Sequence, residues 1–270
     1  MRPATTRVFF ELTREAFRDA MRRRIVPVIA VFALLSLLAV DSCTSCAGSS
    51  QVVQDGAQVS VHDISGWAGM LIFTVLSLWT MVLAGLLAAD HLAETVFDGS
   101  ANLVLARPVR RSEFALARLA GALGIATGTG VVVLTVSTTL LHLRNGVSLG
   151  AAIWAGLACA AGALVVAALA MALSLRLARV ATAMSVLFFV GAIAVVNIFT
   201  LLGASLGRLG YILQHFTPPL CTAVVVALKP WIAPVVPDVD PTIVALKLAF
   251  WVVASVLILL VTFQRQELAS

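Results

Sequence analysis

The sequence predicts an all-α integral membrane protein, and composition, run lengths and the distribution of basic residues all point to this class. Of the 270 residues, 61% are hydrophobic and 11% are charged, and the mean hydropathy is +1.05. Soluble domains carry about 25% charged residues, so this chain has too few charges to cover a water-facing surface. We therefore expect several helices that cross a bilayer.

Six apolar runs reach or approach the length of a transmembrane helix. A hydrocarbon core about 30 Å thick takes about 20 residues in a helix. The first run is short but can be extended by a turn at either end. Residues 25–263 are therefore expected to form a single six-span domain. The predicted spans are Ile25–Val40, Trp67–Ala89, Leu119–Leu141, Leu149–Leu175, Val180–Ala204 and Ile243–Phe263.

Basic residues predict the orientation, because the cytoplasmic flanks of spans hold an excess of Lys and Arg. With the N-terminus inside, 14 of the 18 basic residues fall on the inner side. The four exceptions are Arg144, Arg208, Lys229 and Lys247. We expect a multi-pass protein of the bacterial inner (cytoplasmic) membrane with both termini, including the tail 264–270, in the cytoplasm. The excess of basic over acidic residues then reflects membrane topology and attraction to anionic lipid, not nucleic-acid binding.

Residues 1–24 are predicted to form an amphipathic cytoplasmic helix. Apolar residues recur at helical spacing, including Phe9, Leu12, Ala16 and Phe17, and charged residues occupy the opposite face. The expected posture is interfacial, flat on the inner leaflet; docking on a soluble partner is the alternative. The following apolar run is expected to be a retained signal anchor, since the charged segment before it is too long and too helical for a typical signal peptide.

Two polar segments, 41–66 and 205–242, are predicted as outer loops. In the first, Cys43 and Cys46 have a spacing that permits a disulfide, a metal site or a redox pair. An oxidising compartment favours a disulfide, and His62 is the single further metal ligand nearby. The second contains several prolines, which stop helices. It is expected to form short partial or re-entrant helices before the last span, with a plain loop as the alternative.

The spans contain small residues and uncharged polar groups but no obvious chemical machinery. Gly124 and Gly128 form a small-xxx-small pair that permits close helix contact, and Asn197 is expected to hydrogen-bond between helices in preference to binding substrate. Coupling ions usually need charged groups inside spans, which are missing here. No phosphate-binding loop with its Lys-Ser/Thr occurs, and Ser, His and acidic residues are not grouped as a nucleophilic site. The chain is therefore not expected to be an enzyme or to hold a catalytic residue, a cofactor or a metal.

Residues 90–118 form a predicted cytoplasmic loop rich in charge, with four of the thirteen carboxylates and four of the eighteen basic residues. The second span's helix is expected to run on to Phe97 and stop at Asp98-Gly99, because glycine accepts a left-handed cap. Asp90 and His91 are interpreted as helix capping and loop polarity. Two short helices with a rigid proline between them would make a compact transmission element, and an ordinary solvated connector is the alternative.

In this loop the chain resembles the membrane subunits of ABC transporters of the type-2 permease family. That family has a Glu after its second span, then a Gly, an apolar helical patch, an Arg-Pro-Val-x-Arg segment and an acidic residue before the third span. The six-span layout, the N-terminal amphipathic helix and the broken region before the last span are also similar. The matching residues are Glu94, Gly99, Leu103-Val104-Leu105, Arg107-Pro108-Val109-Arg110-Arg111 and Glu113.

The resemblance implies the permease subunit of an ATP-driven ABC exporter, which couples ATP hydrolysis by a separate ATPase subunit to substrate movement across the membrane. Two membrane subunits, identical or related, would pair in the bilayer, with ATP and Mg²⁺ on the ATP-binding partners and an envelope accessory protein as a further partner. A non-transporting scaffold or assembly factor for an envelope complex is the alternative. The residues expected to contact the ATPase subunit are Glu94, Asp98, Gly99, Arg107, Pro108, Arg110, Arg111 and Glu113.

Overall fold

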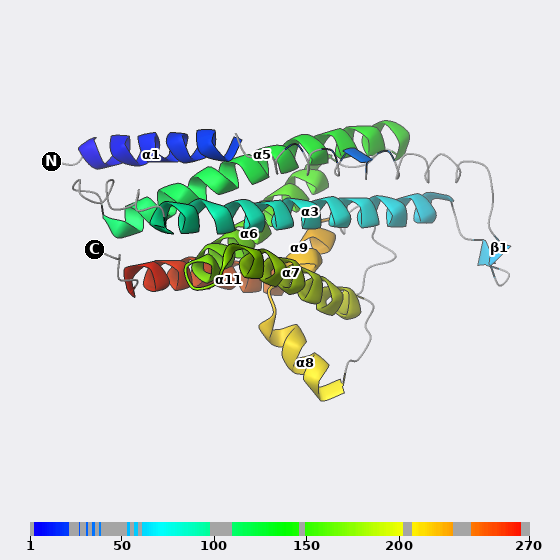
Figure 1. Ribbon diagram of the computed structural model, residues 1–270. Helices are drawn as coiled ribbons and strands as arrows, with labels where there is room; N and C mark the ends of the chain where they lie inside the picture. The colour runs from blue at the N-terminus through cyan, green and yellow to red at the C-terminus, as the bar shows by residue number, and fades with distance from the viewer. Residues whose placement is uncertain are drawn as a thin grey trace.

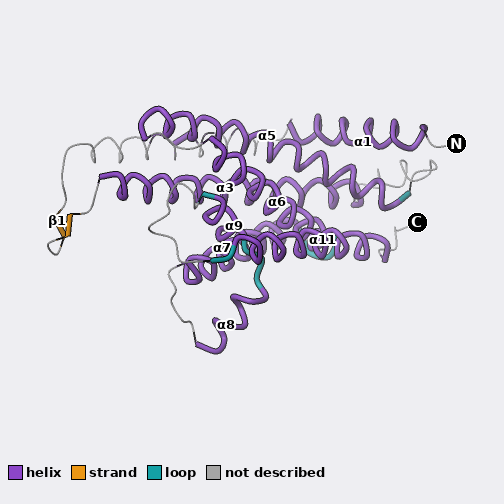
Figure 2. Tube along the Cα trace, turned by 180° about the vertical axis from the view of Figure 1, so that it is seen from behind, coloured by secondary structure: helices purple, strands orange, loops and turns teal. Residues whose placement is uncertain are grey.

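The computed structural model is a bundle of long helices that run side by side (Figures 1 and 2). The only strands in the described part of the chain are a two-residue hairpin, in which β1 (Val53–Gln54) pairs antiparallel with β2 (Ala57–Gln58). The fold is therefore all-helical in its architecture. The structure describes residues 3–21, 53–54, 57–58, 61–97, 110–145, 149–201, 207–228 and 239–265, together with positions 27, 31, 34, 35 and 38.

Five of the helices are long and apolar enough to cross a membrane, which confirms a multi-pass membrane protein. Each corresponds to one of the predicted spans. The first predicted span, Ile25–Val40, lies outside the described residues except for five positions. The five helices are α3 (Val61–Phe97), α5 (Arg111–Asn145), α6 (Leu149–Ser174), α7 (Arg179–Leu201) and α11 (Pro241–Arg265).

The helix α3 lies at the centre of the bundle and is longer than a span requires. It packs against α5, α6 and α7, and its side chains Phe73, Leu76 and Leu87 are buried. At 1.5 Å per residue its 37 residues extend about 55 Å, well beyond a hydrocarbon core of about 30 Å. The predicted second span ends at Ala89 and α3 continues to Phe97, so the last turns of the helix form an arm beyond the span. This confirms the prediction that the helix runs on to Phe97.

Glycines allow close approaches between helices, and one member of the predicted pair, Gly124, takes part in them. A Cβ on Gly121 would lie 2.5 Å from Ala16 Cβ, and one on Gly130 would lie 2.5 Å from Thr80 Cγ2. At Gly128 no atom lies within 4 Å of that position. The close contacts of α5 therefore use Gly121, Gly130 and Gly124, where a Cβ would lie 3.3 Å from the Phe17 ring, and Gly128 faces open space.

The N-terminal helix α1 (Pro3–Met21) is amphipathic, as predicted, and it packs on α5. Both views show α1 running along the same direction as α3 and not across it (Figures 1 and 2). This orientation differs from the flat, interfacial posture expected from the sequence. The physical reason is that the missing side chain of Gly121 lets the backbone of Ala16 approach α5, so the bundle covers that part of the helix.

The proline-rich segment before α11 contains two short helices, α8 (Gly207–Phe216) and α9 (Leu220–Ala227). Residues 220–226 of α9 are all buried, and α9 contacts α3, α6, α7 and α11. Its N-terminus has no cap from its own Pro219. Instead, the buried Asn197 of α7 accepts hydrogen bonds from the Thr222 N–H (3.1 Å) and hydroxyl (2.8 Å). This confirms the predicted helix-to-helix role of Asn197.

Candidate functional site: the end of the bundle that holds both termini

The predicted coupling residues lie at the end of the bundle where both chain termini are found, here called the terminal end (Figure 1). Glu94 lies in the last turns of α3, and Arg110, Arg111 and Glu113 lie at the start of α5. The remaining predicted site residues lie outside the described part of the chain. These are Asp98, Gly99, Arg107, Pro108, Cys43 and Cys46.

The start of α5 is fixed by Glu113. The Arg110 N–H donates to the Glu113 carboxylate at 3.4 Å, and the Arg110 carbonyl accepts from Phe114 N–H at 3.1 Å. This is the reach-back half of a capping box, in which an acidic side chain three residues into the helix binds the N-cap amide. A negative charge is also favourable near a helix N-terminus. Glu113 therefore has a structural role at the helix start, whereas Arg110 and Arg111 are exposed.

An ion pair joins α3 to the first residue of α7. Arg179 Nη2 lies 2.6 Å from Asp90 Oδ2, with 13% of the Asp90 side chain exposed and 70% of that of Arg179. Because the arginine is largely in solvent, the pair contributes at most about 1 kcal/mol to stability. Its geometric effect is larger: it holds the start of α7 against α3 at a point seven residues before α3 ends.

The neighbouring histidine joins α3 to α1. The ring of His91 is fully buried, and its Nε2 lies 2.7 Å from the carbonyl oxygen of Ala16. Since a carbonyl can only accept, this nitrogen carries the proton. A buried hydrogen bond of this kind fixes the ring and the α1 backbone together. The interpretation of Asp90 and His91 as helix capping was wrong, because α3 continues six residues beyond His91 and both side chains bind other helices.

An aromatic contact brings the last helix into the same region. Phe114 of α5 and Phe263 of α11 are stacked with ring centroids 6.2 Å apart, and both are essentially buried. Arg118 lies over the Phe114 ring at 5.4 Å from the centroid, within the range of a cation–π interaction. The first turn of α5 is therefore attached to the C-terminal end of α11.

Together these contacts define what we call the terminal-end cluster: Ala16, Asp90, His91, Phe114, Arg179 and Phe263. Its contacts join α1 to α3, α3 to α7, and α5 to α11. Sequence reasoning missed Arg179 as a partner of Asp90, although both were predicted on the same side of the membrane with opposite charges. The His91–Ala16 bond left no signal, because its acceptor is a backbone carbonyl.

The ion pair can be tested by exchanging its charges. Asp90→Arg alone and Arg179→Asp alone each place like charges within hydrogen-bond distance, so we expect a lower melting temperature for both proteins in detergent. The exchanged double variant restores opposite charges and should recover most of the loss, giving a coupling free energy of about 0.5–1 kcal/mol in a double-mutant cycle. An additive cycle would show that the contact does not join the two helices.

No family model matches the sequence, and no curated protein matches it. Among the residues that the structure describes, no three His, Cys, Asp or Glu side chains are grouped to hold a metal ion. The fold and its candidate site define a multi-pass α-helical membrane protein with a charged, cross-linked terminal end.

Proposed function

We propose that this chain is the membrane (permease) subunit of an ATP-driven ABC transporter of the exporter kind, located in a bacterial inner membrane. The observation that carries the proposal is the terminal-end cluster. A transporter subunit without its own ATP site must receive movement from a partner, and it needs a stiff attachment where that movement arrives. The helical arm of α3 provides such an attachment, because α3 is bonded to α7 and α1 and the start of α5 is packed on α11.

The proposed mechanism passes motion from the loop 90–118 to several helices at once. Closure of the partner ATPase dimer would push the loop and the α3 arm that carries Glu94. The Asp90–Arg179 pair would transmit this displacement to α7, and the His91–Ala16 bond would transmit it to α1. Bundled helices that move as rigid bodies between two packings are a common basis for alternating access.

The charge of the terminal end supports docking of cytoplasmic partners at this surface. Arg110, Arg111, Arg176, Arg179 and Arg265 are exposed on helix ends or turns there. They would contact the ATPase subunit and the anionic headgroups of the inner leaflet. The proposed assembly has six spans per subunit with both termini in the cytoplasm, two such subunits, identical or related, and ATP with Mg²⁺ held by the ATP-binding partners.

Charge reversal at the loop should uncouple the transporter. In the complex reconstituted in liposomes, we expect Glu94→Arg or Arg110→Glu to lower ATPase stimulation by the membrane subunit at least tenfold, because each removes a docking charge at the terminal end. Both proteins should retain wild-type melting temperatures. Arg144→Glu makes the same change of charge at the opposite end of α5 and serves as the control.

Co-purification separates this proposal from the scaffold alternative. A chain expressed with its genomic neighbours should retain a subunit carrying a phosphate-binding loop through detergent extraction. Retention of an envelope protein with no ATPase subunit would support a scaffold or assembly factor instead. Wild-type coupling in both loop variants would contradict the assigned docking residues.

A further inference from the structure

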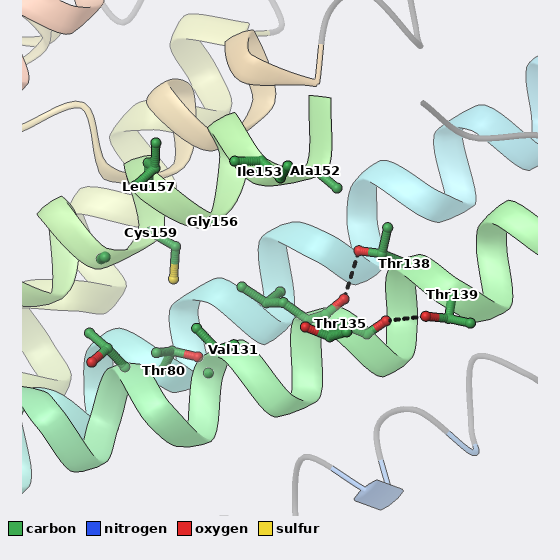
Figure 3. Close-up of a pocket in the computed structure, with 14 residues that line it drawn as sticks. Thr80, Val131, Thr135, Thr138, Thr139, Ala152, Ile153, Gly156, Leu157 and Cys159 are labelled. Carbon is green, nitrogen blue, oxygen red and sulfur yellow. Dashed lines mark hydrogen bonds between the residues drawn. The ribbon is translucent and has the colours of Figure 1, made fainter. Parts of the chain in front are cut away.

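A groove lies between α5 and α6, with α3 as its floor, in the part of the bundle away from the terminal end. Its volume is ≈ 490 Å³, which falls within the range of about 300–1,000 Å³ typical of small-molecule pockets. Figure 3 shows Thr135, Thr138 and Thr139 on one side of this space and Ile153, Gly156 and Leu157 on the other. Val131 and Ile153 are 62% and 65% exposed, so the groove opens onto the lateral surface of the bundle.

The groove is elongated and uncharged. Its lining threonines extend from Thr127 to Thr139 along α5, a distance of about 18 Å at the rise of an α-helix. None of its described lining residues carries a charge, and most are aliphatic. Burying a charged group without a partner is very costly. The shape and the lining therefore favour a narrow, neutral ligand with a long apolar part.

Four of the five threonine hydroxyls that line the groove offer a ligand an acceptor and not a donor. Four lining hydroxyls donate to the carbonyl four residues earlier in the same helix, over 2.6–2.9 Å. A threonine hydroxyl has one proton to donate and two lone pairs to accept, so the free capacity of these groups is as acceptors. The Cys159 thiol likewise points to the Ser77 carbonyl at 3.8 Å. The four bonds are Thr80 to Leu76, Thr127 to Leu123, Thr138 to Leu134 and Thr139 to Thr135.

The glycines show where the groove is closed and where it has room. A Cβ on Gly130 would lie 2.5 Å from Thr80 Cγ2, so α5 rests directly on α3 at the floor. A Cβ on Gly156 would meet nothing within 4 Å. The α6 wall therefore leaves space beside Gly156 that a ligand, or an introduced side chain, can fill.

We propose that this groove binds an uncharged single-chain amphiphile, of the long-chain alcohol type, which enters from the surrounding lipid. Its hydroxyl head donates a hydrogen bond to the threonine oxygens of α5, and its chain lies on the aliphatic residues of α5 and α6. That such a molecule is also the transported substrate rests on the proposed function. The binding itself does not depend on it.

The proposal can be tested on the purified full chain in nanodiscs with a photoactivatable diazirine hexadecanol as the probe. The matched control probe is the methyl ether of the same compound, which keeps the chain and the oxygen but lacks the donor. We expect saturable labelling of peptides covering residues 127–139 and 152–160 by the alcohol, with an apparent affinity about three- to tenfold higher than that of the ether, as the loss of one hydrogen bond predicts.

Two pairs of variants separate the groove from ordinary lipid contact. Gly156→Leu fills the groove and should abolish saturable labelling. Gly128→Leu is the control, because a Cβ there also meets nothing within 4 Å but the residue does not line the groove. It should leave labelling unchanged. The double variant Thr127→Val/Thr139→Val removes two of the lining threonine oxygens and should lower the preference for the alcohol, whereas Thr127→Ser/Thr139→Ser should keep it.

The outcomes are decisive without an ATPase partner. Equal labelling by the two probes, or labelling that survives Gly156→Leu, would overturn the proposal in favour of bulk lipid. Cross-links between α5 and α6 of two different chains in place of lipid labelling would overturn it in favour of a second copy seated in the groove. Selective labelling of a chain that binds no ATPase subunit would support ligand binding in the groove and contradict the proposed function. The binding proposal and the proposed function can therefore fail separately.

Discussion

Replacing Gly121 with leucine should detach α1 from the bundle. A Cβ at this position would lie 2.5 Å from Ala16 Cβ and 3.1 Å from both the Ala16 carbonyl carbon and the Phe17 nitrogen. The latter two are backbone atoms and cannot be relieved by a rotamer change. Overpacking of this kind typically costs 1–3 kcal/mol, and moving α1 away is the cheapest escape because α1 contacts few other elements.

Hydrogen–deuterium exchange would measure this detachment. We expect amides of residues 9–21 to exchange at least tenfold faster in Gly121→Leu, with exchange in α6 and α11 unchanged. The His91–Ala16 hydrogen bond would also be lost, since its acceptor belongs to the displaced helix. If the proposed function holds, ATPase coupling should fall together with this protection.

Controls are available on the same helix. At Gly124 a Cβ would meet only the ring of Phe17, at 3.3 Å, and that side chain can shift, so Gly124→Ala should change exchange little. The pair Gly121→Ala with Ala16→Gly removes the closest Cβ contact and should recover part of the protection. Wild-type exchange in Gly121→Leu would show that α1 is not held by this contact.

The sequence predicted the long helices well because their signal is local. Apolar runs of span length and the continuation of the second span's helix to Phe97 can be read directly from residue types, and the structure places the corresponding helices there. The orientation of α1 could not be read in this way. An amphipathic pattern shows that one face is to be covered, but whether lipid or α5 covers it depends on Gly121, 105 residues after Ala16 in the sequence.

The candidate site was predictable in its position but not in its contacts. The accumulation of charge in residues 90–118 indicated which segment to examine. The pairing of Asp90 with Arg179 and of His91 with a backbone carbonyl depends on how helices far apart in the sequence are packed. A single sequence carries no signal for such pairs. Glu113 was assigned to partner contact, and the structure adds its bond to the Arg110 amide.

Asn197 should be the polar residue of α7 whose loss costs most stability. Its Nδ2 donates to the Ile193 carbonyl of its own helix at 2.9 Å and to the Pro218 carbonyl at 3.3 Å. Its Oδ1 accepts from the backbone and side chain of Thr222. The side chain thus caps the N-terminus of α9, where unpaired N–H groups would otherwise be buried. All of these groups lie in the packed interior.

We expect Asn197→Val to lower the free energy of unfolding in mixed micelles by about 2–3 kcal/mol. The valine keeps the volume but leaves the Thr222 N–H and the Pro218 carbonyl without this partner in an apolar interior, and each buried unsatisfied group costs about 1–3 kcal/mol. Hydrogen bonds between membrane helices average nearer 0.6 kcal/mol, which favours the lower end. Denaturation by sodium dodecyl sulfate, followed by circular dichroism, measures the difference.

The matched control is Thr200→Val, three residues further along α7. The Thr200 hydroxyl donates only to the Val196 carbonyl of its own helix, at 2.9 Å, so its removal should cost less than about 0.5 kcal/mol. Adding Thr222→Val to Asn197→Val also removes the Thr222 hydroxyl, which has lost its acceptor. A coupling free energy of about 1 kcal/mol is therefore expected between the two positions. If Asn197→Val lowered the free energy of unfolding as little as Thr200→Val, α9 would be held in the bundle by apolar packing alone.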